Sequence, residues 1–285
     1  MNMSLDKLNT AGNMNIRKTS IESLEGFSDP FFDQFPLSQG KHQITLPNGD
    51  IKHYLFPTYF SDVTMSAGIF SCNLQKVRQR ISDSRLKPVP TFPGRSMVVI
   101  VNYHYGKIHQ MQPYNETLIM VPVVLGRLVT PLIPALFSSY PGAGYYMLAL
   151  PMNSTENQIR GETIWGLPKT LHKIEHQRKN HDRVTKIYSS PDEIDIEMTL
   201  PMIGRSKKRQ QTGKVYSYLN GDLIKFHSVF SGEIRSQMHL FNQNHKGLRL
   251  GKGPISDLLR CLDVNPKPFM TRSCEGLRSC LFLPD

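Results

Sequence analysis

The sequence of 285 residues predicts a mostly β protein built as one domain, and three patterns in it support that class. The runs Gln43–Leu46 and Ile51–Phe56 flank an Asn-Gly dipeptide, which accepts positive φ and therefore favours a β-hairpin. A stronger hairpin is predicted for Lys214–Leu219 and Leu223–Phe230, because both arms carry β-branched and aromatic residues around an Asn-Gly-Asp turn. A third segment alternates apolar and polar residues with the period of a strand that has one buried face: Ile194, Ile196, Met198 and Leu200.

Helices are expected to be few. Apolar residues near helical spacing predict one over Thr64–Ile81. A second is predicted for Ser154–Ile164, which begins with residues that can cap a helix and must end before Pro168, since the residue preceding a proline is pushed out of the α region. The third, Ile255–Leu262, follows a Gly-Pro pair that is typical of a helix start.

The composition is that of a water-soluble globular protein, with 39% hydrophobic residues. Residues 1–40 show no sustained period and are predicted to be an N-terminal extension of a domain formed by residues 41–285. The most apolar stretch, Leu118–Val129, is too short to span a membrane, and the N-terminus lacks the apolar region of a secretory signal, so we expect a cytoplasmic protein. Four widely spaced cysteines are expected to be free thiols: Cys72, Cys261, Cys274 and Cys280.

The net charge of +11 favours anionic partners in general. The one dense basic cluster has no aromatic residues among its cations, so we predict a solvated loop that steers anionic substrates: Arg205, Lys207, Lys208 and Arg209. A nucleic-acid partner is not expected.

The strongest chemical signal is the segment Gly161–Thr170, which reads Gly-Glu-Thr-Ile-Trp-Gly-Leu-Pro-Lys-Thr. It resembles the signature Gly-Arg-Glu-x-Trp-Gly-x-Pro-Lys-Lys of the acetoacetate decarboxylase superfamily. The match consists of both glycines, the tryptophan, the proline and the first lysine. The resemblance implies that Lys169 is the Schiff-base nucleophile of a closed, conical, antiparallel β-barrel with additional strands and a few helices. The chain departs from the signature at Glu162, Thr163 and Thr170, and the last of these replaces the second lysine.

A second stretch supports the same resemblance. Tyr114, Glu116 and the Val-Pro-Val run that follows are similar to the family's Tyr-x-Glu element, whose glutamate is an active-site acid. The resemblance therefore implies that Glu116 is a catalytic acid and base. The family's essential arginine lies in an early strand, where this chain has Lys52 as its only cation between residues 48 and 54, so that role is not assigned.

The chemistry of such a lysine sets a physical requirement. An amine attacks a ketone only as the neutral base, so the pKa of Lys169 must lie below its ordinary value of about 10.4. Without a second lysine, the lowering of that pKa has to rely more on burial, and Trp165 and Leu167 are the predicted apolar walls. With Tyr114 and Thr170 they form the predicted substrate-binding set.

Other kinds of site are not expected. His172 and His176 would lie about 13 Å apart on one face of a strand, too far to share a metal ion. The Gly-rich turn at Pro141–Gly144 lacks the Gly-Lys-Ser/Thr of a phosphate loop, so we expect neither a nucleotide nor another cofactor.

These observations predict a Schiff-base lyase that acts on a small β-keto or related keto acid, with no nucleic-acid or membrane partner, and we expect a homo-oligomer. Two alternatives stay open. One is an imine-forming aldolase or dehydratase of the same superfamily. The other is a barrel that binds a small ligand without catalysis, which the replacement of the second lysine by Thr170 would favour.

Overall fold

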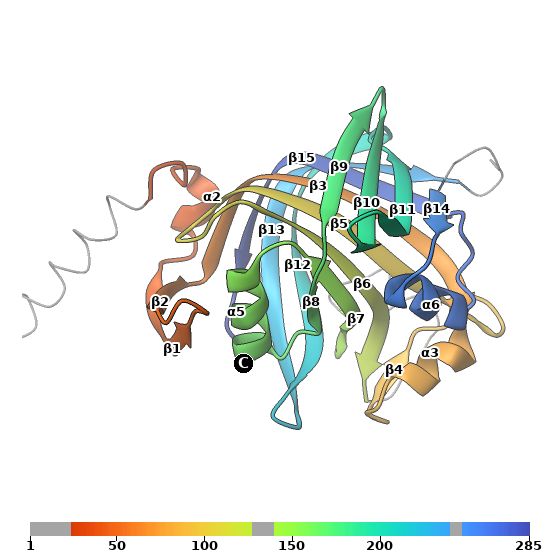
Figure 1. Ribbon diagram of the computed structural model, residues 1–285, viewed down its shortest axis with the longest axis horizontal. Coiled ribbons are helices and arrows are strands. Elements are labelled where there is room, and N and C mark those ends of the chain that lie inside the picture. The colour runs from red at the N-terminus through yellow and green to blue at the C-terminus, as the bar shows by residue number, and fades with distance from the viewer. Residues whose placement is uncertain (1–23, 127–139, 240–246) are drawn as a thin grey trace, which may run out of the picture.

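The computed structural model describes residues 24–126, 140–239 and 247–285, and strands dominate it (Figure 1). The helices are α2 (Pro30–Asp33), α3 (Leu74–Arg80), α5 (Thr155–Trp165) and α6 (Pro254–Cys261). The strands of the first half are β1 (Ser38–Thr45), β2 (Ile51–Phe56), β3 (Thr58–Asn73), β4 (Leu86–Pro88), β5 (Arg95–Ile108), β6 (Tyr114–Leu125) and β7 (Ala143–Met152). Those of the second half are β8 (Lys169–Leu171), β9 (Ile174–Lys179), β10 (Asp182–Ser190), β11 (Glu193–Pro201), β12 (Arg205–Leu219), β13 (Asp222–Met238), β14 (Gly247–Leu250) and β15 (Met270–Leu281).

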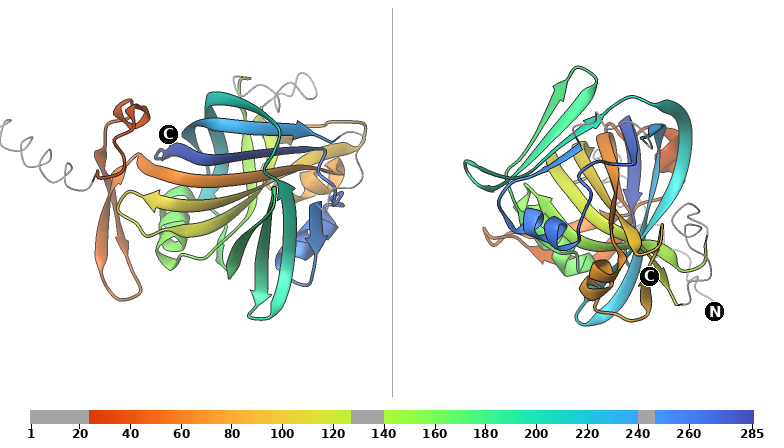
Figure 2. Two further views of the ribbon diagram at one scale, coloured as in Figure 1. Left: turned by 90° about the horizontal axis from the view of Figure 1, so that it is seen from above. Right: turned by 90° about the vertical axis from the view of Figure 1, so that its right-hand side faces the viewer.

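The largest sheet closes on itself. Its strands follow the order β6-β5-β3-β15-β13-β12-β7, and β7 pairs with β6 to complete a seven-stranded barrel (Figure 2). Neighbouring barrel strands are antiparallel except for β7 and β12, which run parallel where Val215 and Tyr216 meet Tyr145 and Tyr146. β4 and β8 extend the sheet beyond the barrel. The mostly β, closed-barrel prediction is confirmed.

A second sheet, in the order β14-β11-β10-β9, packs against the outside of the barrel. The two sheets share a buried core in which Phe70, Ile100 and Ile119 of the barrel wall meet Met198 and Leu200 of the second sheet. The predicted alternating strand is thus confirmed as β11, with its apolar face toward the barrel.

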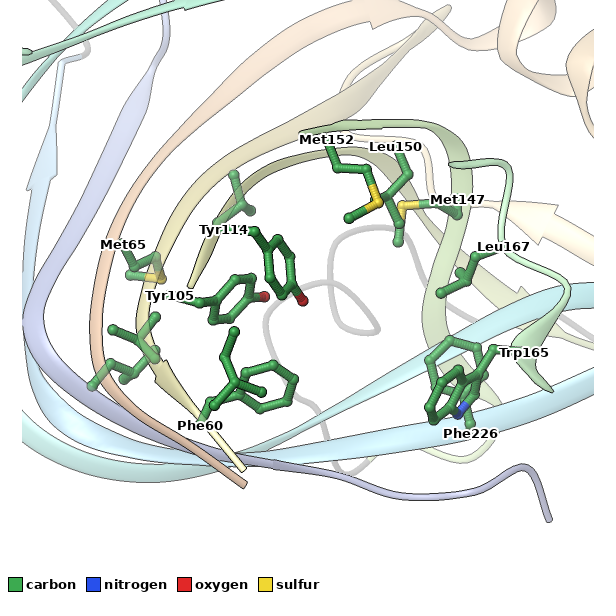
Figure 3. Close-up of a cluster of buried hydrophobic side chains, with 14 of the residues drawn as sticks. Phe60, Met65, Tyr105, Tyr114, Met147, Leu150, Met152, Trp165, Leu167 and Phe226 are labelled. Atoms are coloured by element: carbon green, nitrogen blue, oxygen red, sulfur yellow. The ribbon is translucent and has the colours of Figure 1, made fainter. Parts of the chain in front are cut away.

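The barrel interior holds a separate core. Residues on the opposite faces of the same strands point inward, among them Phe60, Met65, Tyr105, Met147 and Leu150 (Figure 3). Strands β3, β5 and β6 are therefore buried on both faces over much of their length.

The predicted helix over Thr64–Ile81 is wrong for most of its length. Residues up to Asn73 belong to β3, and only Leu74–Arg80 is helical. The Asn73 side chain caps this helix by accepting hydrogen bonds from the backbone amides of Gln75 and Lys76. A strand with two buried faces carries apolar residues at consecutive positions, and this run imitates helical spacing.

The other predicted elements are present. The second hairpin is β12 and β13, whose turn places Asn220 and Gly221 at positive φ of 53° and 89°. The helix at Ile255 is α6, and both predicted arms around Asn48 are strands. The basic cluster at Arg205–Arg209 is not a loop: it forms the exposed first part of β12.

Part of the predicted extension packs on the barrel. Phe27, Phe31 and Phe32 are buried against Tyr59 and Cys280, while residues 1–23 lie outside the described part of the chain. The four cysteines are free thiols. No helix in the described segments is both long and apolar enough to cross a membrane.

Candidate active site

The junction between α5 and β8 sets the position of Lys169. Ser154 begins the helix by accepting a bond from the amide of Asn157, and Gly166 ends it in the left-handed conformation with φ of 57°. A Cβ at Gly166 would lie 1.8 Å from the carbonyl oxygen of Tyr218, so this approach to β12 requires glycine. Lys169 then starts β8, level with Leu150 of β7.

Lys169 and Glu116 form a buried ion pair inside the barrel. The Lys169 Nζ atom donates to Glu116 Oε2 at 3.0 Å, and the two side chains are only 5% and 7% exposed. The lysine is buried, as expected, and the carboxylate lies beside it although 53 residues separate the two in sequence. A buried pair of this kind holds a proton within reach of both groups.

Burial dominates the electrostatics of Lys169. Loss of hydration lowers the pKa of its amine, and the positive charge of Arg160 acts in the same direction, whereas the Glu116 carboxylate raises it. The net pKa lies below the ordinary value, as a Schiff-base lysine requires.

Glu116 is surrounded by hydrogen-bond donors. The Tyr105 hydroxyl and the Asn157 amide each point at one of its oxygens, both at 3.5 Å. Burial, and next the Glu116 charge, raise the pKa of Tyr103, Tyr105 and Tyr114, so these hydroxyls stay protonated.

A cavity of about 100 Å³ opens beside the pair. Predicted site residues Tyr114, Trp165 and Leu167 line it together with Lys169 and Glu116. Figure 3 shows Tyr105 and Tyr114 across the interior from Trp165. Much of the remaining wall is apolar or aromatic: Phe60, Val63, Tyr103, Tyr105, Leu118, Met147, Leu150, Val215, Phe226, Phe230, Leu277 and Leu281.

Thr170 does not belong to this site. It is exposed, it does not line the cavity, and its hydroxyl lies 3.1 Å from His172 Nε2. The reason is the alternation of β8, in which neighbouring side chains point to opposite faces, so a residue next to Lys169 must face away from it.

Arg160 is the functional candidate that the sequence interpretation missed. It is 1% exposed and lies on α5 one residue before Gly161, where an added Cβ would lie 2.2 Å from Lys169 Cε. Arg160 occupies one of the buried positions of α5, which recur every three or four residues, and this helical period could have revealed it. The buried positions are Asn157, Arg160, Gly161, Ile164 and Trp165. Lys52 instead pairs with Glu156 at 3.1 Å.

The described residues contain no group of three or more His, Cys, Asp and Glu side chains placed to hold a metal ion. His172 and His176 have separate partners, the former contacting the Tyr188 carbonyl and the latter the Thr185 hydroxyl.

The strands and the buried pair together define a class of protein: a closed barrel that presents a lysine amine to a carboxylate within an enclosed cavity. The chain belongs to the acetoacetate decarboxylase family. The family described as "Acetoacetate decarboxylase (ADC)" matches residues 45–200, more than half of the chain and the part that contains both Glu116 and Lys169.

Solved structures share the fold. The enduracididine biosynthesis enzyme MppR, complexed with the condensation product of pyruvate and imidazole 4-carboxaldehyde, aligns with a TM-score of 0.53 and 12% identity over 80% of this chain and 88% of that one. An acetoacetate decarboxylase from Legionella pneumophila gives 0.53 and 12% over 80% and 86%. An acetoacetate decarboxylase-like enzyme from Sphingomonas wittichii RW1 gives 0.50 and 13% over 84% and 96%. No curated protein sequence gives a significant match.

Proposed function

We propose that the protein is a Schiff-base lyase that removes carbon dioxide from a small β-keto acid through an imine on Lys169. The observation that carries this proposal is the buried Lys169–Glu116 pair at 3.0 Å, an amine and a carboxylate that line the same cavity. Membership of the acetoacetate decarboxylase family supports it.

The first half of the reaction forms the imine. Glu116 takes a proton from the Lys169 ammonium, and the neutral amine then forms a bond to the carbonyl carbon of the substrate. The former carbonyl oxygen takes up a proton that the nitrogen gives up, and the resulting carbinolamine hydroxyl then accepts the proton held by Glu116 and leaves as water, so that the nitrogen becomes a protonated imine. No cofactor enters this balance.

The second half breaks the carbon–carbon bond. The electron pair of the bond to the carboxylate moves toward the protonated imine, carbon dioxide leaves, and an enamine remains. An acid then protonates the enamine carbon, and water adds to the imine to release the ketone and the free lysine. Glu116 and the Tyr105 hydroxyl, which lie 3.5 Å apart, are the groups placed to carry these protons.

The charges of the cavity favour decarboxylation. Among the described residues that line it, Lys169 and Glu116 are the only two with ionic side chains. A substrate carboxylate has no further cation to pair with there, and an unpaired buried carboxylate is costly. Loss of carbon dioxide removes that charge, whereas a 2-keto acid such as pyruvate keeps its carboxylate throughout an aldol or dehydration cycle.

The aldolase or dehydratase alternative rests on the similarity to MppR, whose structure holds a product of pyruvate condensation. It uses the same Lys169 imine but needs an anchor for a carboxylate that is retained. The two reactions therefore differ in the acid that the site accepts and in the release of carbon dioxide.

The test is to trap the imine. The protein is incubated separately with acetoacetate, acetone and pyruvate, borohydride is added, and the labelled peptide is identified by mass spectrometry while carbon dioxide release is measured in parallel. We expect an adduct at Lys169 and carbon dioxide from acetoacetate. Lys169→Ala should abolish both, whereas Lys173→Ala, which removes an exposed lysine four residues away, should not.

Each other outcome is informative. Adducts with pyruvate without carbon dioxide release from acetoacetate would replace the decarboxylase by the aldolase or dehydratase. No adduct with any of the three compounds would contradict imine chemistry and leave the barrel as a binding protein.

A further inference from the structure

Arg160 is a buried cation enclosed by aromatic rings. Its guanidinium carbon lies 4.7 Å from the ring centre of Tyr54, 5.1 Å from that of Phe56 and 4.9 Å from that of Trp165. The guanidinium also donates to the Thr58 hydroxyl and contacts Met111 Sδ at 3.6 Å. Contacts with ring faces and a hydroxyl stabilise the positive charge without cancelling it.

No carboxylate in the described part of the chain lies within ion-pair distance of Arg160. The residue one helical turn earlier, Glu156, has the spacing for such a pair, but its carboxylate binds Lys52 at 3.1 Å and the Tyr54 hydroxyl at 2.7 Å instead. The buried Nε atom of Arg160 has no hydrogen-bond partner among the described residues. A buried charge without a counterion is costly, so a structure that keeps one calls for an explanation.

The same turn of α5 touches Lys169. A Cβ placed on Gly161 would lie 2.2 Å from Lys169 Cε, so the backbone next to Arg160 packs directly on the lysine side chain. Trp165 connects the two cations, since its ring contacts the guanidinium and also lines the cavity that Lys169 faces. The positive charge of Arg160 lowers the pKa of Lys169, as expected for two like charges in a poorly hydrated interior.

We propose that Arg160 is a positioning residue that acts through Lys169: its uncompensated charge, held behind Trp165, favours the neutral amine that attacks a carbonyl. This inference rests on the proposed function only because imine formation is the step that requires a neutral amine. Arg160 supplies a cation from α5, whereas Thr170 replaces the second lysine of the signature and Lys52 pairs with Glu156.

Several other groups act on the two cations, and the test must leave them unchanged. Lys169 interacts with Glu116 of β6 and Glu162 of α5 as well as with Arg160, and burial lowers its pKa most. Arg160 interacts with Glu156, and burial lowers its own pKa to about 10. The neighbouring groups with raised or lowered pKa values are Tyr54, Tyr103, Tyr105, Tyr114 and His109, and Arg160 contributes to the lowered pKa of His109.

The experiment measures the protonation of Lys169 directly. Full-length protein is treated with trace acetic anhydride, a small neutral reagent that acetylates only neutral amines, and the extent of Lys169 acetylation is followed by mass spectrometry from pH 5 to 11. Arg160→Met should raise the midpoint by about one pH unit or more, which means about a tenfold loss of labelling at pH 7. Arg160→Lys keeps the charge and should stay near the wild-type midpoint.

Three further variants separate charge from structure. Thr58→Asp puts a carboxylate beside the intact guanidinium and should raise the midpoint as Arg160→Met does, while the uncharged Thr58→Asn should not. The matched control is Arg183→Met. Arg183 is also buried, with a pKa near 10 and an Nε that has no hydrogen-bond partner in the described part of the chain, but it lies in the second sheet and is not among the groups that shift the pKa of Lys169.

The outcomes decide the inference independently of the proposed reaction. The inference would be overturned if the extent of Lys169 acetylation at pH 7 agreed within a factor of two between wild type, Arg160→Met and Thr58→Asp. It would also be overturned if Lys169 of the wild-type protein were not acetylated at pH 7. A shifted midpoint in a protein that forms no borohydride-trapped adduct would uphold the role of Arg160 and reject the proposed function.

Discussion

Opposing influences act on the single amine of Lys169. Burial removes its hydration and lowers its pKa, the charge of Arg160 lowers it further, and Glu116 raises it. Because Glu116 stabilises the ammonium but is also the nearest proton acceptor, its removal should affect the charge of the lysine and the chemistry in opposite directions.

Replacing Glu116 by Gln tests this opposition. The amide keeps the side-chain shape but removes the charge, so the pKa of Lys169 should fall and its acetylation at pH 7 should rise or stay equal. Without the proton acceptor, release of carbon dioxide from acetoacetate should fall about a hundredfold or more. Parallel loss of labelling and turnover would mean that Glu116 acts only by holding the lysine in place.

Gly161 is a second residue on which the placement of Lys169 depends. A methyl group there would overlap Lys169 Cε and Cδ, at 2.2 and 2.4 Å, and would push the amine away from Glu116. We expect Gly161→Ala to lose borohydride trapping at least about tenfold. Its urea midpoint should change little, since alanine is the better helix former and the displaced atoms belong to a flexible side chain. Full trapping would contradict this contact.

At the scale of elements, the decisive feature is the sharp end of α5. The left-handed Gly166 turns the chain, and β8 then runs parallel to β7 with Lys169 opposite Leu150. Trp165 anchors the turn, as its indole donates to the Phe282 carbonyl at 2.8 Å and its own carbonyl accepts from the Ser217 hydroxyl at 2.5 Å.

Gly166→Ala should destabilise this junction severely. The substitution combines a left-handed backbone with a Cβ 1.8 Å from the Tyr218 carbonyl oxygen, and we expect a loss of more than about 3 kcal/mol in the free energy of unfolding. Gly221→Ala is the matched control, because that glycine also has positive φ but open space around it, and it should cost only about 1 kcal/mol. Urea denaturation of both variants measures the difference, and equal losses would contradict the close approach to β12.

At the scale of the whole molecule, a neutral histidine connects the second sheet to the barrel. His176 of β9 lies between Thr185 of its own sheet, at 2.9 Å, and the Tyr103 carbonyl of the barrel strand β5, at 3.4 Å. Burial, and then the charge of Arg183, lower the pKa of His176 to about 3. His176 therefore binds a proton near pH 6.5 in the unfolded chain but stays neutral at that pH in the folded protein.

This difference predicts a loss of stability in acid. Between pH 6.5 and about 3 the unfolded state binds more protons than the folded state. The free energy of unfolding should therefore decrease as the pH is lowered, by up to about 1.4 kcal/mol per pH unit from this residue. His176→Gln should flatten the dependence of the urea midpoint on pH over that range. The exposed His181→Gln is the control and should follow the wild-type curve. An unchanged slope in His176→Gln would show that the histidine is protonated in the folded state.

The sequence by itself determined the features that depend on neighbouring residues. The Asn-Gly turns favour positive φ, the serine and glycine at the ends of α5 satisfy its free backbone groups, and alternation marks β11. The resemblance around Lys169 and Glu116 also depends on local spacing, and the family match to residues 45–200 confirms it.

Only the tertiary structure decided the features that depend on distant parts of the chain. Burial on both faces made a strand of Thr64–Asn73, where the local spacing imitates a helix. Barrel closure brought Glu116 to within 3.0 Å of Lys169, and the pleat of β8 turned Thr170 outward. The packing of Arg160 of α5 against Tyr54 and Phe56 of β2 enclosed it in rings, while Glu156 paired with Lys52 instead. Local preferences are set by a few neighbours along the chain, whereas hydration and charge at a buried site are set by every strand that surrounds it.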